Sequence, residues 1–480
     1  MKALSAVLSV NLLAAGALMV GADASAGASD PAASVTHATG TLADGATWIA
    51  DVPGNWNGTV LLFSHGYGPP VAADAPGQPG AKTALLDRGY ALAGSSYDPN
   101  GSWWALNSAV GDQFQALDAV ESSVLPGKPR QVLAVGESMG GLISALEAQD
   151  GAGRIDGALS TCGIVAGGIN LNNYQLDGEY TLAQLLRPGQ PVQLVGFQQA
   201  GDASETVTAL SAAAATAQQT AAGRARLALA MAFINVPSWS SEQAPPPPAN
   251  DPAAQEAGQY AVEFSGLFGI PGVFPNTLGF IEGARYSLNQ ADGGGDATWT
   301  RGVDFASLLD HSPYKTEVAA LYRAAGLSLH ADLGTLTSNA DISADPAAVH
   351  SLTATSAPTG HLDVPALDMH TISDQLVPVQ QENFYADQVR NAGSGELLRQ
   401  AYVASVGHCN FSPAELLAGV HAISRRVATG HWGSVAEPQK LQQFANNLAR
   451  NDTGVGVARF VRYEPGRLTG VNGPYDPAEN

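Results

Sequence analysis

Basic residues and cysteines are scarce in this sequence. Lysine and arginine total 22 against 43 aspartates and glutamates, which gives a formal net charge of −21 at pH 7. A surface of this charge repels the phosphate backbone of nucleic acids and anionic lipid headgroups, so we expect neither as a partner. Only two cysteines are present, Cys162 and Cys409, and an oxidising compartment would allow them to pair. The chain also lacks a redox-cofactor motif, and no cofactor is expected.

Long apolar runs are absent beyond the N-terminus. There, Lys2 is followed by an apolar stretch from Ala3 to Val20 and by the small residues Ala24-Ser25-Ala26. This pattern predicts a secretory signal peptide over residues 1–26 that is removed on export, so we expect an extracellular protein. A retained membrane anchor is the alternative, but the run is short and interrupted by polar residues. No later segment is long enough to span a bilayer, so stable membrane insertion is not expected.

The 480 residues, 45% of them hydrophobic, suffice for one large core plus an insertion or a second domain. Short apolar strands alternate with segments of helical periodicity over the first third of the chain. We expect strands within 46–64 and at 90–97, 131–135 and 155–161, and helices at 81–88, 111–124 and 140–149. This alternation predicts an α/β fold with a doubly wound, mostly parallel sheet and helices on both faces.

This alternation stops after Gly163 and resumes only near Val364, where VPALDMHTI predicts a strand and residues 379–391 a helix. The residues between include an alanine-rich helical tract from 208 to 233 and apolar segments near 264–281. We therefore interpret residues 163–355 as a mainly helical cap inserted between a first core part, 27–162, and a second core part, 356–480.

The stretch Gly136-Glu137-Ser138-Met139-Gly140 lies where an apolar strand gives way to a helix. A G-x-S-x-G match alone is weak in a chain with 54 glycines, but the strand before it and the helix after it supply the required setting. Such a turn lifts a hydroxyl to the carboxyl edge of the sheet, and side chains at Gly136 and Gly140 would collide where strand and helix cross. We therefore predict that Ser138 is a nucleophile.

This pentapeptide resembles the nucleophile elbow of the α/β-hydrolase superfamily, and the resemblance covers roughly residues 45–162 and 360–430. It implies an oxyanion hole made by the amide after the serine, at Met139, and by a second amide in the loop after an earlier buried strand. That strand ends in Ser64-His65-Gly66-Tyr67-Gly68, which is similar to the family's HGGG-type loop. We select the Tyr67 amide, and an ordinary glycine-rich turn is the alternative.

The superfamily's chain order places the acid and then the histidine after the serine. Asp374 lies just past the strand of VPALDMHTI, at the edge where an acid is needed, and Pro378 suits the start of the next helix. Asp363 and Asp368 compete with it, but the first precedes the strand and the second lies within it. We predict Asp374 as the acid that orients the base.

Ten histidines are present, and His408 is the one that follows a last apolar strand and a turn after Asp374. We predict that it accepts the proton of Ser138. A surface or helix-capping role for His408 is the alternative. His421 and His431 lie farther along, in or after a helix, and are interpreted as structural.

No metal site is expected. His361 and His370, taken with Asp363 and Asp368, lack the spacing of a known metal site. The run Asp292-Gly-Gly-Gly-Asp296 lacks the remaining ligands of a calcium loop, and we interpret it as a flexible turn.

The cysteines flank the predicted site. Cys409 adjoins His408, and Cys162 ends the strand after the elbow helix, at the same carboxyl edge. A disulfide here would hold the histidine loop against the sheet, and two separate buried thiols are the alternative. Tannases and fungal-type feruloyl esterases are similar in joining a cysteine beside the catalytic histidine to one beside the serine. Glu137 precedes Ser138 here, so this resemblance is partial.

Two further features concern the substrate. Trp103 and Trp104 follow another strand at this edge and would line an apolar or aromatic subsite, although core packing explains a tryptophan pair equally well. The insertion begins where the superfamily commonly places its cap or lid, above the nucleophile, so it would decide which acyl and leaving groups enter.

Together these residues predict an exported serine hydrolase that cleaves a small or polymeric carboxylic ester through an acyl-enzyme. A peptidase of the same fold, resembling the superfamily's aminopeptidases, is one alternative. It would need clustered acids in the insertion, and we interpret Glu256 and Glu263 as a solvated helix face instead. A non-catalytic binding protein on a hydrolase scaffold is the other alternative, although such a protein usually loses a member of the triad.

Overall fold

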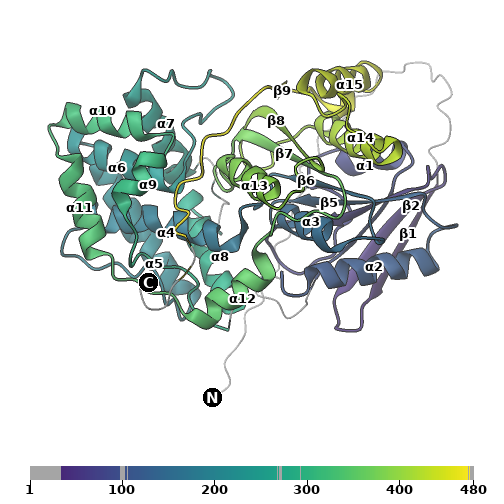
Figure 1. The fold of residues 1–480 in the computed structure, drawn as a ribbon, viewed down its shortest axis with the longest axis horizontal. Helices are drawn as coiled ribbons and strands as arrows, with labels where there is room; N and C mark the ends of the chain where they lie inside the picture. Colours follow the sequence, from purple (N-terminus) through teal and green to yellow (C-terminus); the bar gives the residue numbers. More distant parts are fainter. Residues whose placement is uncertain are drawn as a thin grey trace, which may run out of the picture.

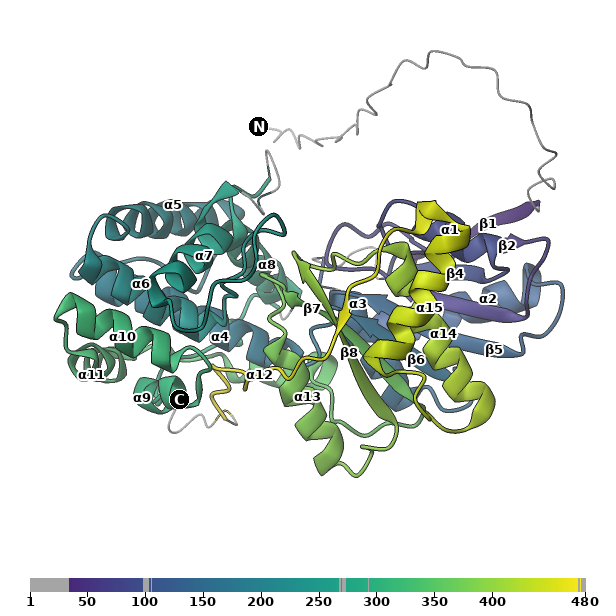
Figure 2. The same ribbon diagram turned by 90° about the horizontal axis from the view of Figure 1, so that it is seen from above.

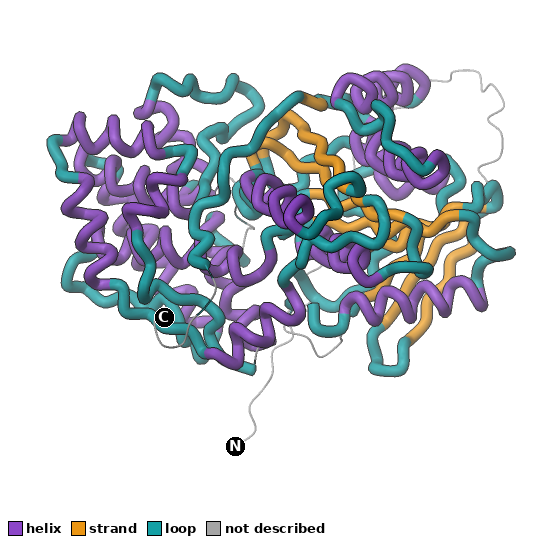
Figure 3. The backbone as a smooth tube through the Cα atoms, in the orientation of Figure 1, coloured by secondary structure: helices purple, strands orange, loops and turns teal. Residues whose placement is uncertain are grey.

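The computed structural model describes residues 34–97, 103–104, 106–266, 269, 273–291, 293–473 and 475. The expected signal peptide, residues 1–26, lies outside this part of the chain. Strands gather in one half of the molecule, and a separate group of helices forms the other half (Figure 3). Within the described ranges, no helix combines the length and the apolar character needed to cross a membrane.

In the described part of the chain, a nine-stranded sheet has the order β1-β2-β4-β3-β5-β6-β7-β8-β9. Its strands are β1 (Val35–Thr41), β2 (Thr47–Pro53), β3 (Thr59–Ser64), β4 (Ala91–Ser95), β5 (Gln131–Glu137), β6 (Gly157–Thr161), β7 (Ala366–Ser373), β8 (Leu398–Val406) and β9 (Phe460–Val461). Strands β3 to β8 pair in parallel, whereas β1, β2 and β9 are antiparallel to their neighbours. The predicted mostly parallel sheet is confirmed.

Helices cover both faces of this sheet (Figure 1). The first face carries α1 (Ala81–Asp87), α14 (Pro413–Thr429) and α15 (Pro438–Asn451), and the second carries α2 (Ala109–Ser123), α3 (Met139–Asp150) and α13 (Gln380–Asn391). Along β3, Leu61 and Phe63 pack on the first face and Val60 and Leu62 on the second. Burial on both faces explains why β3 is a continuous apolar run.

The inserted segment folds into a helical cap with a hydrophobic core of its own. It comprises α4 (Gly167–Leu186), α5 (Ala200–Ala217), α6 (Ala221–Ile234), α7 (Pro252–Phe264), α8 (Thr277–Ala291), α9 (Phe305–His311), α10 (Lys315–Ala325), α11 (Leu329–Asn339) and α12 (Pro346–Ser356). Helix α6 is buried along most of its length and packs against α4, α7 and α10. The cap therefore forms around α6.

The expected alanine-rich helix over 208–233 is in fact two helices, α5 and α6. Thr220 caps α6 by accepting a hydrogen bond from Gly223 N at 2.9 Å. A Cβ on Gly223 would lie 2.1 Å from Ala217 O, so this tight connection requires glycine. The break between α5 and α6 arises from the helix-capping residue Thr220 and from the close backbone approach at Gly223. Neither feature changes the apolar pattern of the sequence, so the pattern does not show the break.

The last described residues leave the core. After β9 the chain crosses to the cap (Figure 2), where Thr469 N donates to Asn235 Oδ1 at 2.9 Å and Tyr475 Oη donates to Ala344 O at 2.8 Å. The expected division assigns residues 356–480 to the core. This final segment instead joins core and cap.

Candidate active site

Ser138 lies on a strained turn between β5 and α3. Its backbone has φ 62° and ψ −121°, a conformation that side-chain-bearing residues rarely adopt. A Cβ on Gly136 would lie 1.8 Å from Gly140 O, and a Cβ on Gly140 would lie 1.9 Å from Ser64 O. Both glycines are therefore required for the close crossing of β5, β3 and α3, and this crossing places Ser138 at the carboxyl edge of the sheet.

Ser138, His408 and Asp374 form one hydrogen-bonded chain. The Nε2 of His408 lies 2.8 Å from Ser138 Oγ, and its Nδ1 lies 2.8 Å from Asp374 Oδ2. Asp374 directly follows β7 and His408 follows β8, so the carboxyl edge brings both to the serine. Gly407, at φ 109°, donates its amide hydrogen to Ser373 O at 2.9 Å and holds the two loops together. This arrangement can move a proton from the serine hydroxyl to the imidazole.

Asp374 is buried but well supplied with donors. Its Oδ1 accepts backbone hydrogen bonds from Leu376 at 3.0 Å and from Val377 at 2.9 Å. Burial alone would raise the pKa of Asp374, but His408, the nearby His370 and the Val377 amide outweigh burial and lower it. Asp374 is therefore held as the carboxylate, the form that can orient His408.

His370 lies behind Asp374, a position that the sequence did not predict. His370, on β7, has its Nε2 3.7 Å from Asp374 Oδ2 and its Nδ1 2.9 Å from Glu382 Oε1. All three side chains are buried. Strand alternation predicts that His370 points to one face of the sheet, but nothing in the sequence indicates its partner on α13.

The loop that contains Tyr67 lies against the serine. A Cβ on Gly66 would lie 3.2 Å from Ser138 Cβ, so the loop backbone passes beside Ser138. The Nδ1 of His65 lies 2.7 Å from Gly66 O, and its ring stacks on Tyr97 at 4.2 Å, contacts that brace the turn. Met139 is the first residue of α3, where amides lack partners within the helix. The Tyr67 loop and the start of α3 thus flank Ser138 from two sides.

Cys162 and Cys409 form a disulfide that links positions 247 residues apart. Cys162 N donates to Met369 O at 2.8 Å, which ties this end of the bridge to β7. Gln78 Nε2 donates both to Glu137 Oε2 at 2.8 Å and to Cys409 O at 2.9 Å. The loop of His408 is therefore held both covalently and by a hydrogen-bond link to the residue before the serine.

A loop of the cap also holds the histidine segment. Glu242 accepts hydrogen bonds from Ser405 Oγ at 2.8 Å and from Val406 N at 3.2 Å, and it pairs with Arg459 at 2.6 Å. Burial would raise the pKa of Glu242, but these hydrogen bonds and the arginine charge lower it. The carboxylate therefore connects the cap to the end of β8.

The two tryptophans line different spaces. Trp104 is buried in the wall of a cavity of about 30 Å³ over Ser138 and His408, which Ile281 of α8 also lines. Trp103 lines a wider pocket farther out. The cap thus covers the serine closely.

The interpretation of Glu256 and Glu263 as a solvated face is wrong. Both side chains are buried within the cap, because α6, α8 and α10 pack around α7. Burial raises the pKa of Glu256 to about 7 and that of Glu263 to about 8. Neither lines the cavity over Ser138. The charged side chains of Glu256 and Glu263 predict a solvent-facing side of the helix, but neighbouring helices cover that side.

The competing acids and histidines lie apart from Ser138 Oγ. Asp363 is exposed and pairs with His361 at 3.5 Å, Asp368 is buried within β7, and His421 stacks on Phe444 at 4.0 Å.

Possible metal ligands are gathered at one place in the described ranges. Cys162, His408 and Cys409 form that group, but both cysteines are in the disulfide. Asp292 lies outside the described residues, and Asp296 accepts a hydrogen bond from Gly196 N at 2.7 Å.

A serine on a strand-to-helix turn at the top of a parallel sheet, followed along the chain by an acid and then a histidine, is the arrangement of the α/β-hydrolases. The chain has the α/β-hydrolase fold. It is 28% identical over 463 residues to the o-phthalyl amidase of Xanthobacter agilis, a match that covers 92% of this chain and 97% of that protein. No protein-family model matches the chain.

Solved structures similar to this chain include esterases and a peptidase. Feruloyl esterase B from Aspergillus oryzae has a TM-score of 0.36 and 14% identity, covering 82% of this chain and 80% of that one. Brefeldin A esterase, described as a bacterial homologue of human hormone-sensitive lipase, has a TM-score of 0.36 and 13% identity, covering 88% and 78%. The Pyrococcus horikoshii acylaminoacyl peptidase has a TM-score of 0.33 and 10% identity, covering 91% and 43%.

Proposed function

We propose that this protein is a serine hydrolase that cleaves a carboxylic ester through an acyl-enzyme. The observation that carries the proposal is the continuous hydrogen-bonded chain from Ser138 Oγ through His408 to the carboxylate of Asp374. Ser138 Oγ attacks the carbonyl carbon while His408 Nε2 takes its proton, and the same imidazole then protonates the leaving alkoxide. Water, deprotonated by His408, releases the acid and restores the serine.

The tetrahedral intermediate carries a negative charge that the site must stabilise. We propose the backbone amides of Tyr67 and Met139 as its donors, since the Gly66 backbone passes beside Ser138 and α3 begins directly after it. The N-terminus of α3 adds a favourable dipole. Amides in fixed positions need no reorganisation when the charge develops, so they favour the transition state over the substrate.

Amide hydrolysis is the second candidate, and the similarity to o-phthalyl amidase favours it. The chemistry differs in one step, because the leaving amine must receive its proton from His408 before the C–N bond breaks. An aminopeptidase is less well supported, since the residues lining the cavity over Ser138 include no acid to bind a free amino terminus. A non-catalytic scaffold is disfavoured by the intact hydrogen-bonded chain.

The test compares matched substrates. We expect p-nitrophenyl butanoate to be hydrolysed by the wild type and not by Ser138→Ala, and butanoyl p-nitroanilide to be hydrolysed more slowly than the ester. Faster cleavage of the anilide than of the ester would indicate that amide hydrolysis is the main activity of the protein. Equal rates for the wild type and Ser138→Ala would refute the serine mechanism.

We also propose that the protein works outside the cell. The predicted signal peptide and the Cys162–Cys409 disulfide support this, because such a bond persists in an oxidising compartment. N-terminal sequencing of the secreted form tests it, and we expect the mature chain to begin at Gly27.

A further inference from the structure

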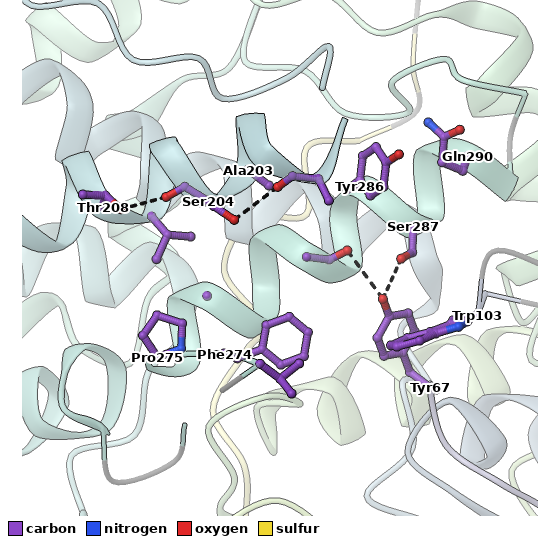
Figure 4. A pocket seen from close by; sticks show the side chains of 15 residues that line it. Tyr67, Trp103, Ala203, Ser204, Thr208, Phe274, Pro275, Tyr286, Ser287 and Gln290 are labelled. Atoms are coloured by element: carbon purple, nitrogen blue, oxygen red, sulfur yellow. Dashed lines mark hydrogen bonds between the residues drawn. The ribbon is translucent and has the colours of Figure 1, made fainter. Parts of the chain in front are cut away.

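A second pocket, of about 580 Å³, lies between α5 and α8 of the cap (Figure 4). Its apolar and aromatic walls are formed by Tyr67, Trp103, Val207, Phe274, Pro275 and Tyr286. Ser204 and Thr208 lie on its α5 side, and Ser287 and Gln290 on its α8 side. Among the described residues that line this pocket, none carries a charge at neutral pH, so it suits a neutral, apolar group.

The mouth of this pocket exposes large apolar side chains. Trp103 is 39% exposed and Val273 54%, in a protein whose other large apolar side chains are mostly buried. Trp103 also has φ 78°, a strained conformation for a bulky residue. Exposed apolar groups gathered at one concave site mark a place where a ligand is bound.

The pocket adjoins the nucleophile through Tyr67 and α8. Tyr67 lines both this pocket and the cavity over Ser138. Helix α8 separates the two spaces, with Gly283 and Ser287 facing the pocket and Phe280 and Ala284 facing the cavity.

The ring of Tyr67 forms the rest of this boundary. It meets Trp103 and Phe280 edge to face, each at 5.6 Å, and its hydroxyl donates to Ser287 Oγ at 2.6 Å (Figure 4). The same hydroxyl lies 3.5 Å from Gly283 O, so its polar contacts with α8 and the aromatic contacts form this part of the wall between pocket and serine.

The geometry points to this pocket as the subsite for a neutral aromatic ring on the acyl part of the substrate, reached from Ser138 when Tyr67 and α8 separate. The inference rests on the proposed function, and the pocket of about 580 Å³ offers far more room for an acyl group than the cavity of about 30 Å³ over the serine. Edge and face contacts from Tyr67, Trp103 and Phe274 favour an aromatic ring over an alkyl chain.

The experiment uses substitutions that fill the pocket with a larger side chain at its exposed side. The kcat/KM values of p-nitrophenyl acetate and of p-nitrophenyl esters of ω-phenylalkanoic acids of graded chain length are measured for the wild type, Ser204→Trp and Thr208→Trp. Both altered residues are exposed, so the variants should fold. Ala212→Trp is the control, because Ala212 is an exposed residue of α5 outside the pocket.

In the wild type, we expect one chain length to exceed acetate in kcat/KM. Both pocket variants should lower that ratio about tenfold or more, while Ala212→Trp should keep it. A ratio that is the same in the pocket variants and the control would overturn the inference.

Calorimetric binding of the matching ω-phenylalkanamide to Ser138→Ala separates the subsite from catalysis. Binding weakened by Ser204→Trp supports the pocket even if no ester is cleaved, a result that would refute only the proposed function. Ester cleavage without such weakening would refute only the pocket.

A second inference rests on different contacts, those of His370. Its Nε2 lies 2.8 Å from Val377 O, a carbonyl that can only accept, and its Nδ1 lies 2.9 Å from Glu382 Oε1. Gln400 Nε2 donates to the other oxygen of Glu382 at 2.6 Å. Both ring nitrogens therefore face acceptors, and the ring satisfies both by carrying two protons.

We infer that His370 is a buried imidazolium and a positioning residue that keeps Asp374 ionised. The groups that face this cluster are Asp368 on β7, Glu382 and Tyr385 on α13, Tyr402 on β8, and Asp374. Burial opposes the charged ring, but Glu382, Asp374 and Val377 outweigh it and raise the pKa of His370.

Nitrogen NMR of selectively labelled histidines tests the charge without reference to catalysis, with the His370 signals assigned by their loss in His370→Gln. We expect both nitrogens to be protonated at pH 7, and a neutral ring would refute the inference. His370→Gln should lower kcat about tenfold with little change in KM, whereas His421→Gln should match the wild type. A protonated ring with unchanged kcat in His370→Gln would refute the positioning role, even where the proposed function holds.

Discussion

Two groups of buried ionisable residues, one at the candidate active site and one around α7 of the cap, differ in how they are compensated. In the core, the buried Asp374, His370 and Glu382 are arranged so that each charge faces an opposite charge or a hydrogen bond. In the cap, burial raises the pKa of Glu263 to about 8 and of Glu317 to about 8, and in the described residues neither carboxyl oxygen of Glu263 has a hydrogen-bond partner. The site surrounds its ionisable groups with compensating partners, whereas burial favours the neutral form of these two cap acids.

Glycines at the candidate active site and an exposed glycine of the cap differ in packing. In the core, Gly136 and Gly140 permit backbone contacts that no side chain would allow. In the cap, Gly334 on α11 has open space around it and a helical backbone. The tight crossing at the site requires glycine, whereas the position of Gly334 does not.

The largest effect is expected from the triad acid. Asp374→Asn keeps the shape of the side chain but loses the charge that orients and stabilises His408, so kcat should fall by about 10⁴-fold. Asp363→Asn removes an exposed carboxylate that precedes β7, at the opposite end of this strand from Asp374, and should retain wild-type kcat. Ester kinetics on both variants measure the difference, and similar losses in the two would remove Asp374 from the proposed mechanism.

Glycine substitutions test the packing contrast. Gly140→Ala places a methyl group against Ser64 O and should destabilise the fold by more than about 4 kcal/mol. Gly334→Ala should stabilise it by about 0.5 to 1 kcal/mol, since a helix interior favours alanine. Urea unfolding measures both changes, and a tolerated Gly140→Ala would mean that the crossing of α3 and β3 is less tight than described.

The disulfide is a third difference between the two regions, because both of its cysteines lie in the core. Replacing both Cys162 and Cys409 with serine removes a closed loop of 247 residues and should lower the free energy of unfolding by about 3 kcal/mol. Activity should fall as well, since Cys409 adjoins His408. Thermal scans with and without dithiothreitol measure this, with the double variant as the control that reductant should not affect. A wild type insensitive to reductant would argue against a stabilising bridge.

The smallest effect concerns the buried acids of the cap. The pKa of Glu263 is raised to about 8, so its contribution favours the fold below the ordinary pKa of 4.5 and is lost as pH rises from there to about 8. Glu263→Gln should therefore be more stable than wild type at pH 8.5 and equal to it at pH 4. Unfolding curves at both pH values measure this, and a pH-independent difference would show that Glu263 does not titrate in this window.

The sequence predicts the parallel core well because burial on both faces leaves continuous apolar strands such as β3 and β5. It fails at β1, which is mostly exposed and is held by backbone pairing with β2, so its side chains carry no apolar pattern. It fails also at β9, which has only two residues. Edge strands depend on contacts that composition does not record.

At the site, the chain order of Ser138, Asp374 and His408 follows from where strands end, and strand ends are visible in the sequence. The hydrogen-bond partners of Glu382 and Glu242 are not visible in the sequence, because they depend on how α13 and a cap loop pack across the edge of the sheet. Glu263 gives the same lesson, since a charged residue indicates a solvated face only where no other helix covers it.

The central claim is that Ser138 is made nucleophilic by His408, and a fluorophosphonate probe tests it most directly. Peptide mass mapping should find the wild type labelled at Ser138, with no label in Ser138→Ala and a greatly slowed reaction in His408→Ala. A folded wild type that takes no label, or one labelled as fast without His408, would contradict the account.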